Sequence, residues 1–353
     1  MMENKKVKIF FFGSGAFAVP VLEALCLNPK IQMCGIITQP DKPAGRKMAL
    51  TPTPVGKWCD AHEIECRRIR SVNEPEFFEL LKAESPDIIV VVSFGQILKE
   101  PILNLPKFCC LNVHASLLPK YRGASPITAV VLNGDLESGV CFMHMDKGLD
   151  TGAVFESHKL TLPPEIRTDA LETLLSGLAA QKIVSCITNI TEHHLAAIPQ
   201  NHTAATLSKK IRKSDGAMKW GESAVVIERK IRAFHPWPSV CFCLPVQDRC
   251  ANVKITAGRS IQTPCVAEPG RILKIDKEGI TVACGIGGTI YRLCLLRKAL
   301  PRSETPAAVP AAVKTVFTVS DWPAPVFGLA VPFTAAPQLE QKFALALISA
   351  PQF

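Results

Sequence analysis

Residues 87–93 read DIIVVVS, and this stretch decides the fold class. Positions 88–92 are all Ile or Val, so the run lacks the alternation of polar and apolar residues that marks a strand with one solvent-exposed face. A short, continuous β-branched run is typical of a strand that is buried on both faces of a parallel sheet. Residues 7–12, VKIFFF, form a second β-type run at the start of the chain. The two runs predict strands of a buried sheet.

Segments with strand-like and helix-like patterns alternate on either side of this run. Such alternation predicts an α/β domain whose sheet is mostly parallel. The predicted strands are 7–12, 33–38, 87–93, 139–145 and 153–162, and the predicted helices are 19–28, 54–62, 74–83 and 168–192.

Catalytic types of polar residue gather in residues 109–152, CCLNVHASLLPKYRGASPITAVVLNGDLESGVCFMHMDKGLDTG. Asn112 and His114 are two positions apart on a predicted strand, so their side chains share one face. A Pro- and Gly-rich loop follows, which places the pair at the carboxyl edge of the sheet, where open α/β sheets bind ligands. Asp150 comes after the strand at 139–145 and is expected to reach the same edge. An amide, an imidazole and a carboxylate can stabilise an oxyanion and move a proton, so this edge is the candidate active site.

Two further loops are candidates for binding. Phe94, Gly95 and Ile97 follow the central strand and form either the wall of a site for a flat heterocycle or ordinary core. The loop at 38–54, TQPDKPAGRKMALTPTP, has four Pro and excludes a regular helix or a central strand. It is either a disordered excursion or a mobile arm that grips a substrate, and its length and its three cationic side chains favour an arm. The cationic side chains are Lys42, Arg46 and Lys47.

Two other patterns suggest sites that we do not expect. Gly13, Gly15 and Ala18 fit a loose dinucleotide-binding fingerprint with Asp41 downstream, but the same turn joins the first strand and helix of many α/β folds, so we expect no NAD. Cys59, His62 and Cys66 are the nearest approach to a metal-ligand pattern. Isolated Cys are usually small core residues, and we expect no metal there.

Composition indicates a globular protein with two domains. The 353 residues are 48% hydrophobic and 20% charged, and no apolar run approaches the ~20 residues that span a bilayer. The N-terminal residues pass directly into a strand without a cleavage site, so we expect a cytoplasmic protein that does not contact a membrane. The 14 Cys are scattered and are expected to be reduced.

The net charge of +9 is concentrated in one part of the chain. Residues 203–302 contain 18 Lys and Arg against 7 Asp and Glu, a net charge of +11, and the remaining residues sum to −2. A basic domain beside a nearly neutral one indicates either a polyanion-binding domain or a solvated basic surface without a partner.

The predicted organisation has four parts. We expect a catalytic domain at 1–195, a linker at 196–208, a basic domain at 209–300 and an Ala- and Pro-rich tail at 301–353 that is poorly structured. A helix is predicted at 222–234. From 240 to 296, short strand-like runs separated by turns predict a small barrel or sandwich.

The chain resembles the methionyl-tRNA formyltransferase family over residues 7–296. The segments that carry the resemblance are FFGSGAFA, TQPDKPAGR, VVVSFGQIL, LNVHASLLPKYRGASPI, MDKGLDTG and IRAFHPWP. The resemblance implies a Rossmann-like first domain, an OB-like second domain, a 10-formyltetrahydrofolate donor and a charged initiator methionyl-tRNA acceptor. It also implies transfer without metal or NAD, and we expect a monomer.

The resemblance assigns roles to matching positions. Asn112, His114 and Asp150 fall on the catalytic trio, with Asp150 holding His114 in its cationic form, and Arg46 falls on the loop that grips the acceptor end of the tRNA. The folate-binding segment corresponds to Ser116, Leu117, Leu118 and Pro119. We expect Lys209, Lys210 and Arg212 to add tRNA contacts. The alternatives are a formyltransferase acting on a small amine, such as glycinamide ribonucleotide or an amino sugar, and a non-catalytic RNA-binding protein.

Overall fold

The chain forms two compact units. The computed structural model describes residues 6–45, 48–246, 249–261, 266–276, 279–285 and 295–297. The boundary between the units lies between Lys210 and Ile211, and a short helical segment, Val131–Asn133, groups with the second unit.

A seven-stranded sheet forms the centre of the first unit, in the order β10-β9-β7-β6-β1-β2-β5. Strands β5, β2, β1, β6 and β7 run parallel to one another, whereas β9 runs antiparallel to both β7 and β10. The prediction of a mostly parallel sheet is therefore confirmed. The strands are β1 (Val7–Gly13), β2 (Ile31–Thr38), β5 (Arg67–Arg68), β6 (Ile88–Val92), β7 (Cys109–His114), β9 (Glu137–His144) and β10 (Val154–Thr161).

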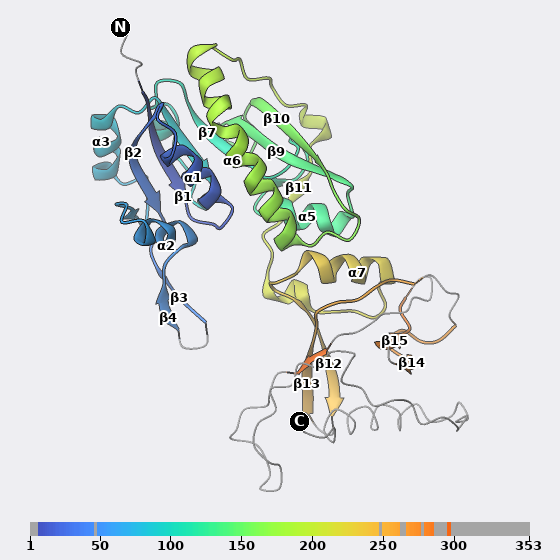
Figure 1. Cartoon of the computed structure of the whole chain (residues 1–353). Coiled ribbons are helices and arrows are strands. Elements are labelled where there is room, and N and C mark those ends of the chain that lie inside the picture. The colour runs from blue at the N-terminus through green and yellow to red at the C-terminus, as the bar shows by residue number, and fades with distance from the viewer. Residues whose placement is uncertain are drawn as a thin grey trace. The chain divides into compact units, whose positions relative to one another are not determined.

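Helices on both faces of the sheet explain why β6 is apolar at every position. α1 (Ala18–Cys26) and α6 (Thr168–Glu192) pack against each other on one face (Figure 1). On the other face, α3 (Pro75–Glu84) and α4 (Glu100–Leu103) contribute to a buried cluster that includes Phe10, Phe12 and Ile89. Because each face is covered, all five residues of β6 are buried.

The predicted helices of the first unit are present, and their ends follow from local sequence. α2 (Pro54–Ala61) starts with Pro at its first position, and the Thr53 side chain accepts the Gly56 N–H at 3.0 Å. α3 also begins with Pro, and Ser85 ends it in a left-handed conformation. Two further helices, α4 and α5 (Pro126–Asn133), were not predicted from the sequence.

α6 corrects the expectation about membrane-spanning length. Within the described residues it is one helix that is long and apolar enough to cross a bilayer by length and composition. It also packs against α1, β9 and β10. Its buried residues recur at helical spacing and account for its apolar character as a core helix. They are Leu171, Leu175, Ser176, Ala179, Ile183, Cys186, Ile187 and Ile190.

The Pro-rich loop at 38–54 contains a small antiparallel hairpin. Its strands are β3 (Lys42–Ala44) and β4 (Ala49–Thr51), which pair with each other apart from the central sheet. The exclusion of a central strand is confirmed. The base of the hairpin is tied down because Arg68 donates to Asp41 at 3.0 Å and to both carboxylate oxygens of Asp60 at 2.7 and 2.6 Å.

The segment expected to be a linker, 196–208, makes ordered contacts within the first unit. Ile198 forms a β-bridge with Val154, and β11 (Leu207–Ser208) pairs in parallel with β8 (Arg122–Gly123). A 3₁₀ turn, His202–Ala204, lies between these contacts. The helix α6 therefore does not end the first unit, which continues to Lys210.

The second unit has one helix followed by short strands in its described part. The helix predicted at 222–234 is α7 (Ala224–Ala233), which follows a 3₁₀ turn at Lys213–Gly216. β12 (Val240–Val246), β13 (Arg249–Ile255) and β16 (Leu295–Arg297) form a three-stranded antiparallel sheet. β14 (Ile272–Asp276) and β15 (Gly279–Val282) form a separate pair. The tail at 301–353 lies outside the described residues.

The cysteines depart from expectation at one position. Ten of them are free thiols in the described part of the chain. Cys243 is disulfide-bonded, so the expectation that all Cys are reduced is wrong there.

The packing of Phe12 yields a test of the core. Its ring is fully buried between Phe77 and Phe94, with centroid distances of 6.0 and 5.3 Å. Phe12→Ala should lower the free energy of unfolding by about 3–5 kcal/mol, because it removes buried area and leaves a cavity. Urea denaturation followed by circular dichroism measures the change. Leu27→Ala, at a position 77% exposed, serves as the control and should change stability by less than about 0.5 kcal/mol. Equal effects of the two changes would contradict this core.

Candidate active site

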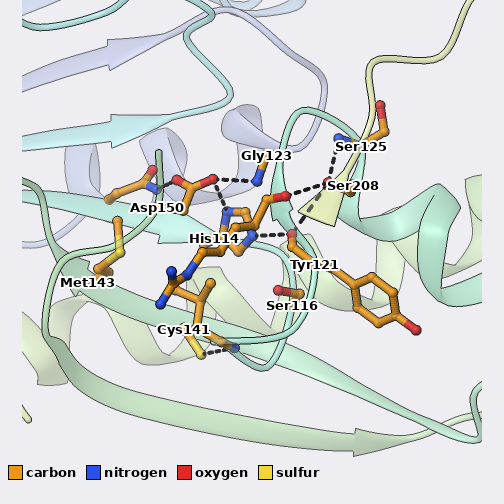
Figure 2. A network of polar contacts seen from close by, with 12 residues as sticks. His114, Ser116, Tyr121, Gly123, Ser125, Cys141, Met143, Asp150 and Ser208 are labelled. Atoms are coloured by element: carbon orange, nitrogen blue, oxygen red, sulfur yellow. Dashed lines mark hydrogen bonds and ion pairs between the residues drawn. The ribbon is translucent and has the colours of Figure 1, made fainter. Parts of the chain in front are cut away.

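The structure brings Asn112, His114 and Asp150 together. Asn112 and His114 lie near the carboxyl end of β7, and Asp150 lies in the turn between β9 and β10 (Figure 2). Asn112 Nδ2 donates to Asp150 Oδ1 at 3.3 Å, and His114 Nδ1 lies 3.7 Å from Asp150 Oδ2. The antiparallel pairing of β7 with β9 produces this proximity, because Leu111 of β7 is opposite His144 at the end of β9.

The partners of His114 define which nitrogen can exchange a proton. Nε2 lies 3.0 Å from the backbone oxygen of Tyr121. A carbonyl oxygen can only accept, so Nε2 carries a hydrogen. Nδ1 faces the Asp150 carboxylate and is therefore the nitrogen on which the ring can gain or lose a proton. The ring is only 6% exposed, which keeps this exchange away from bulk water.

The Asp150 carboxylate joins two loops. Its Oδ2 accepts the backbone N–H of Gly123 at 2.7 Å, and its Oδ1 accepts from Asn112. The Asn112 amide nitrogen has two N–H groups, so one remains for another acceptor. The site therefore holds an amide donor and an imidazole on opposite sides of one anchored carboxylate.

The turn that carries Asp150 is closely packed. Asp146 accepts from Gly148 N at 2.9 Å and from Thr151 Oγ1 at 2.7 Å. A Cβ at Gly152 would lie 1.8 Å from the backbone oxygen of His144, so this position requires glycine.

The segment proposed to bind folate forms its own turn. Ser116 is fully buried, and its hydroxyl donates to the backbone oxygen of Lys120 at 2.6 Å. The Leu118 N–H donates to Cys141 Sγ at 3.3 Å, and Leu118–Pro119 is a cis peptide. Burial raises the pKa of the Cys141 thiol, so the sulfur stays neutral. Leu117, Leu118 and Pro119 are half-buried and present apolar surface beside β7.

The loop after β6 divides its side chains between core and surface. Phe94 is 2% exposed and packs on Phe12, so its ring belongs to the core. Its backbone oxygen accepts from Gln39 Nε2 at 2.7 Å. Gly95 has a positive φ of 77°, and Ile97 is 83% exposed. Of the three residues of this loop that were predicted to bind the cofactor, Ile97 is the one with an exposed side chain.

The cationic residues predicted to contact RNA are apart from the trio in sequence. Lys42, on β3, donates to the Gln39 side chain at 2.6 Å. Lys209, Lys210 and Arg212 are exposed around the boundary between the units. Arg46 and Lys47 lie outside the described residues.

Two residues that the sequence analysis did not select belong to the same network. Gln200 is 9% exposed and donates to the backbone oxygens of Asp150 and Gly152 at 3.0 and 2.6 Å. Arg122 is 5% exposed and donates to Gln200 Oε1 at 3.1 and 2.7 Å. Arg122 stands in the YRG stretch beside the SLLP segment, and this position is a weak sequence signal of a role in the site. Gln200 has none, since it lies in a segment expected to be a linker.

The patterns that suggested other ligands have structural roles here. A Cβ at Gly15 would lie 3.0 Å from Ser93 Cβ, so the close approach of two loops explains this glycine. Asp41 pairs with Arg68. In the described part of the chain, no group of three His, Cys, Asp or Glu side chains could hold a metal, and this includes the set of Cys59, His62 and Cys66.

Comparisons with known proteins identify the family. Residues 5–187 match the model of the formyl transferase family, and residues 210–300 match the model of the formyl transferase C-terminal domain. The methionyl-tRNA formyltransferase of Aromatoleum aromaticum is 39% identical over 297 residues, covering 84% of this chain and 91% of that protein. That of Geobacter sulfurreducens is 34% identical over 300 residues, covering 84% and 92%. The chain belongs to the methionyl-tRNA formyltransferase family.

Solved structures agree on the fold of this formyltransferase. The sugar 3N-formyltransferase WlaRD has a TM-score of 0.58 at 19% identity and covers 83% of this chain and 99% of its own. An N-formyltransferase from Helicobacter canadensis has a TM-score of 0.57 at 16% identity, with 81% and 98% covered. These likenesses support the Rossmann-like first unit with its mostly parallel sheet.

The backbone at Asp150 yields a prediction about stability. Its φ of 52° is left-handed, a conformation that costs an L-residue about 1 kcal/mol but costs glycine nothing. Asp150→Gly and Asp150→Ala both remove the carboxylate. The Gly variant should be the more stable of the two by about 0.5–1 kcal/mol, since only Ala retains the strain. Urea unfolding of both proteins measures the difference. If the Ala variant is as stable as the Gly variant, the turn is not strained.

Proposed function

We propose that the chain transfers a formyl group from 10-formyltetrahydrofolate to the α-amine of methionyl initiator tRNA, for translation initiation. The observation that carries this proposal is the contact of Asn112, His114 and Asp150 at the sheet edge in a chain of this family. Formyl transfer to an amine requires a hydrogen-bond donor to the carbonyl oxygen and a group that takes the proton from the amine, and the trio offers both.

Asn112 and His114 would bind the formyl oxygen as it gains negative charge. The second N–H of Asn112 Nδ2 is one donor. His114 becomes a second donor when Nδ1 is protonated, because the 3.7 Å to Asp150 Oδ2 is too long for a hydrogen bond and leaves that N–H for the formyl oxygen. Asp150 would also relay the proton from the attacking amine to N10 of the donor, as the amine bonds to the formyl carbon and the bond from N10 to that carbon breaks. None of these steps needs a covalent enzyme intermediate.

The residues around β7 suit a folate donor. The flat, apolar part of such a molecule needs an apolar surface near the trio, and the half-buried Leu117, Leu118 and Pro119 supply one next to His114. The exposed Ile97 lies in the loop after β6, the strand that pairs with β7. When bound, the donor supplies the formyl carbon. Ser116 would shape the turn through its bond to Lys120 instead of touching the ligand.

The second unit and the hairpin would hold the tRNA. We infer that residues 209–300 form an OB-like domain, because short antiparallel strands follow α7 and residues 210–300 match the family's C-terminal model. Residues 1–195 together with the segment 196–208, which packs in the first unit, would be the catalytic domain, and residues 301–353 would be a tail. Lys42 and Arg46, with Lys47, would grip the acceptor end, while Lys209, Lys210 and Arg212 would contact phosphates.

We infer a cytoplasmic monomer that acts away from membranes and uses neither metal nor NAD.

A small-amine acceptor is the competing function. WlaRD is a sugar 3N-formyltransferase, and the Helicobacter canadensis enzyme was solved in complex with folinic acid and dTDP-3-aminofucose; both share this fold at low identity. The net charge of +11 over residues 203–302 and the C-terminal match favour tRNA, because a small amine does not need a large cationic surface. An RNA-binding protein without activity would not need the contact of Asn112, His114 and Asp150.

Removal of either proposed donor tests the reaction. Asn112→Ala and His114→Ala should each lower the rate of formyl transfer about 10²–10³-fold, because the developing charge loses one donor. The assay measures labelled formyl incorporation into charged initiator tRNA at saturating donor. Parallel reactions with elongator methionyl-tRNA, glycinamide ribonucleotide and an amino sugar identify the acceptor. Folded variants with wild-type rates would disprove the mechanism, and incorporation into a small amine alone would disprove the acceptor.

The exposed cations near Lys210 predict salt-dependent binding. Replacing Lys209, Lys210 and Arg212 by Ala should weaken tRNA binding and reduce the slope of log K against log salt by roughly 0.7–0.9 per lost phosphate contact. Fluorescence anisotropy with labelled tRNA at several salt concentrations measures both effects. Lys82→Ala, an exposed cation on α3, is the matched control and should change neither. An unchanged slope in the triple variant would show that these residues do not contact phosphate.

A further inference from the structure

The catalytic carboxylate lies on a backbone that needs support from its surroundings. Asp150 has a φ of 52° and belongs to the turn 150–152, which we call the Asp150 turn. A left-handed residue other than glycine keeps one conformation only where neighbouring groups fix it. A tilt of this turn would move the carboxylate, and the His114 Nδ1 to Asp150 Oδ2 distance of 3.7 Å would change with it.

The Gln200 side chain holds the Asp150 turn through two backbone oxygens of the turn. Its Nε2 donates to the oxygen of Asp150 at 3.0 Å and to the oxygen of Gly152 at 2.6 Å, so one amide group spans the whole turn. Among the described residues, no hydrogen bond joins Gln200 to His114 or to Asn112. Its effect on them passes through the turn.

Arg122 sets the orientation of that amide. A guanidinium group only donates, so the Gln200 atom that receives Nε at 3.1 Å and Nη2 at 2.7 Å must be Oε1. The amide therefore cannot flip without breaking all four bonds. Arg122 and Gln200 are 5% and 9% exposed, and no ion pair joins Arg122 to a carboxylate in the part of the chain that the structure describes. Its cationic donors serve Gln200 and, at 3.2 Å, His202 Nδ1.

The residues on either side of Arg122 serve the other members of the site. The Tyr121 backbone oxygen receives His114 Nε2, and the Gly123 N–H donates to Asp150 Oδ2. Three successive residues thus fix the imidazole, the amide clamp and the carboxylate. The segment that carries Gln200 is held to the same strand, because Leu207 and Ser208 pair with Arg122 and Gly123. Figure 2 shows Ser208 close to Tyr121.

We propose that Gln200, oriented by Arg122, is a positioning residue that holds the Asp150 turn so that its carboxylate meets His114 Nδ1. The proposal rests on the formyl transfer proposed above. It adds a residue from the segment 196–208 to the machinery of the first unit. The clamp acts on geometry alone, so it should affect turnover and leave substrate binding unchanged.

Gln200→Met tests the clamp, because Met has a similar length and cannot donate. The variant should lower kcat about 10- to 100-fold, the range expected when a catalytic group is misplaced by about 1 Å. KM for methionyl-tRNA and for the formyl donor should each stay within about threefold, since Gln200 contacts neither ligand in this assignment. Thr203→Ala, at an exposed position three residues away whose side chain bonds only locally, is the control and should keep the wild-type kcat.

A double-mutant cycle between Gln200 and Asp150 separates a positioning role of Gln200 from a general structural one. In an Asp150→Ala background, Gln200→Met should change kcat by less than about twofold, because the group it positions is absent. A full 10-fold loss in that background, about the same as in the wild type, would overturn the proposal. So would an unchanged kcat in the single variant, or a loss confined to KM. If Gln200→Met does not fold, Arg122→Lys provides a second variant. It keeps the charge but loses the pair of hydrogen bonds to Gln200 Oε1, and it should give the same non-additive pattern with a smaller loss of kcat.

Amide exchange provides a readout that does not depend on activity. The Gly123 N–H, which donates to Asp150 Oδ2, should exchange about 3- to 10-fold faster in Gln200→Met, because the turn is looser. Unchanged exchange at Gly123 would overturn the clamp. If exchange responds as expected but the wild-type protein transfers no formyl group to methionyl-tRNA, the proposed function fails while the clamp stands.

Discussion

The hydrogen bond from the Gly123 N–H to Asp150 Oδ2, 2.7 Å long, joins the two loops on which the site depends. The loop after β7 carries Gly123, and the turn between β9 and β10 carries Asp150. A carboxylate that accepts a backbone N–H is held by a group that cannot rotate away. Because the same oxygen faces His114 Nδ1, the bond fixes the carboxylate against the imidazole. The remaining contacts of the site keep these two loops in place.

The sheet makes that contact available. β6 and β7 are parallel, so the loops that follow them open at the same edge, and β9 returns antiparallel to β7. The antiparallel return brings the start of the β9–β10 turn close to Asn112 and His114. Phe10, Phe12 and their neighbours bury one face of the parallel strands, and α1 and α6 cover the other, so this edge rests on a packed core. A site built on such strands can hold three polar groups in a fixed geometry.

The chain also separates the tasks of reaction and acceptor recognition. The trio and its support lie within the first unit, which is close to neutral, whereas the excess of cationic residues lies in residues 203–302. The segment containing Gln200 links the two regions in sequence, and its strand pairing shows that it is part of the first unit's packing. A change in this segment would therefore reach the Asp150 turn directly.

The sequence by itself determined the alternation of strands and helices, the parallel sheet, and the pair Asn112 and His114 on one face of β7. These features depend on periodicity and on local rules such as proline at a helix start, which are written in neighbouring residues. Only the tertiary structure decided the partners of His114, the burial of Phe94 in the core, and the roles of Arg122 and Gln200. Those depend on contacts between residues far apart in the chain, such as Arg122 and Gln200, which are 78 positions apart. No local pattern could reveal Gln200, because its two carbonyl partners and its guanidinium partner meet it only after the chain has folded.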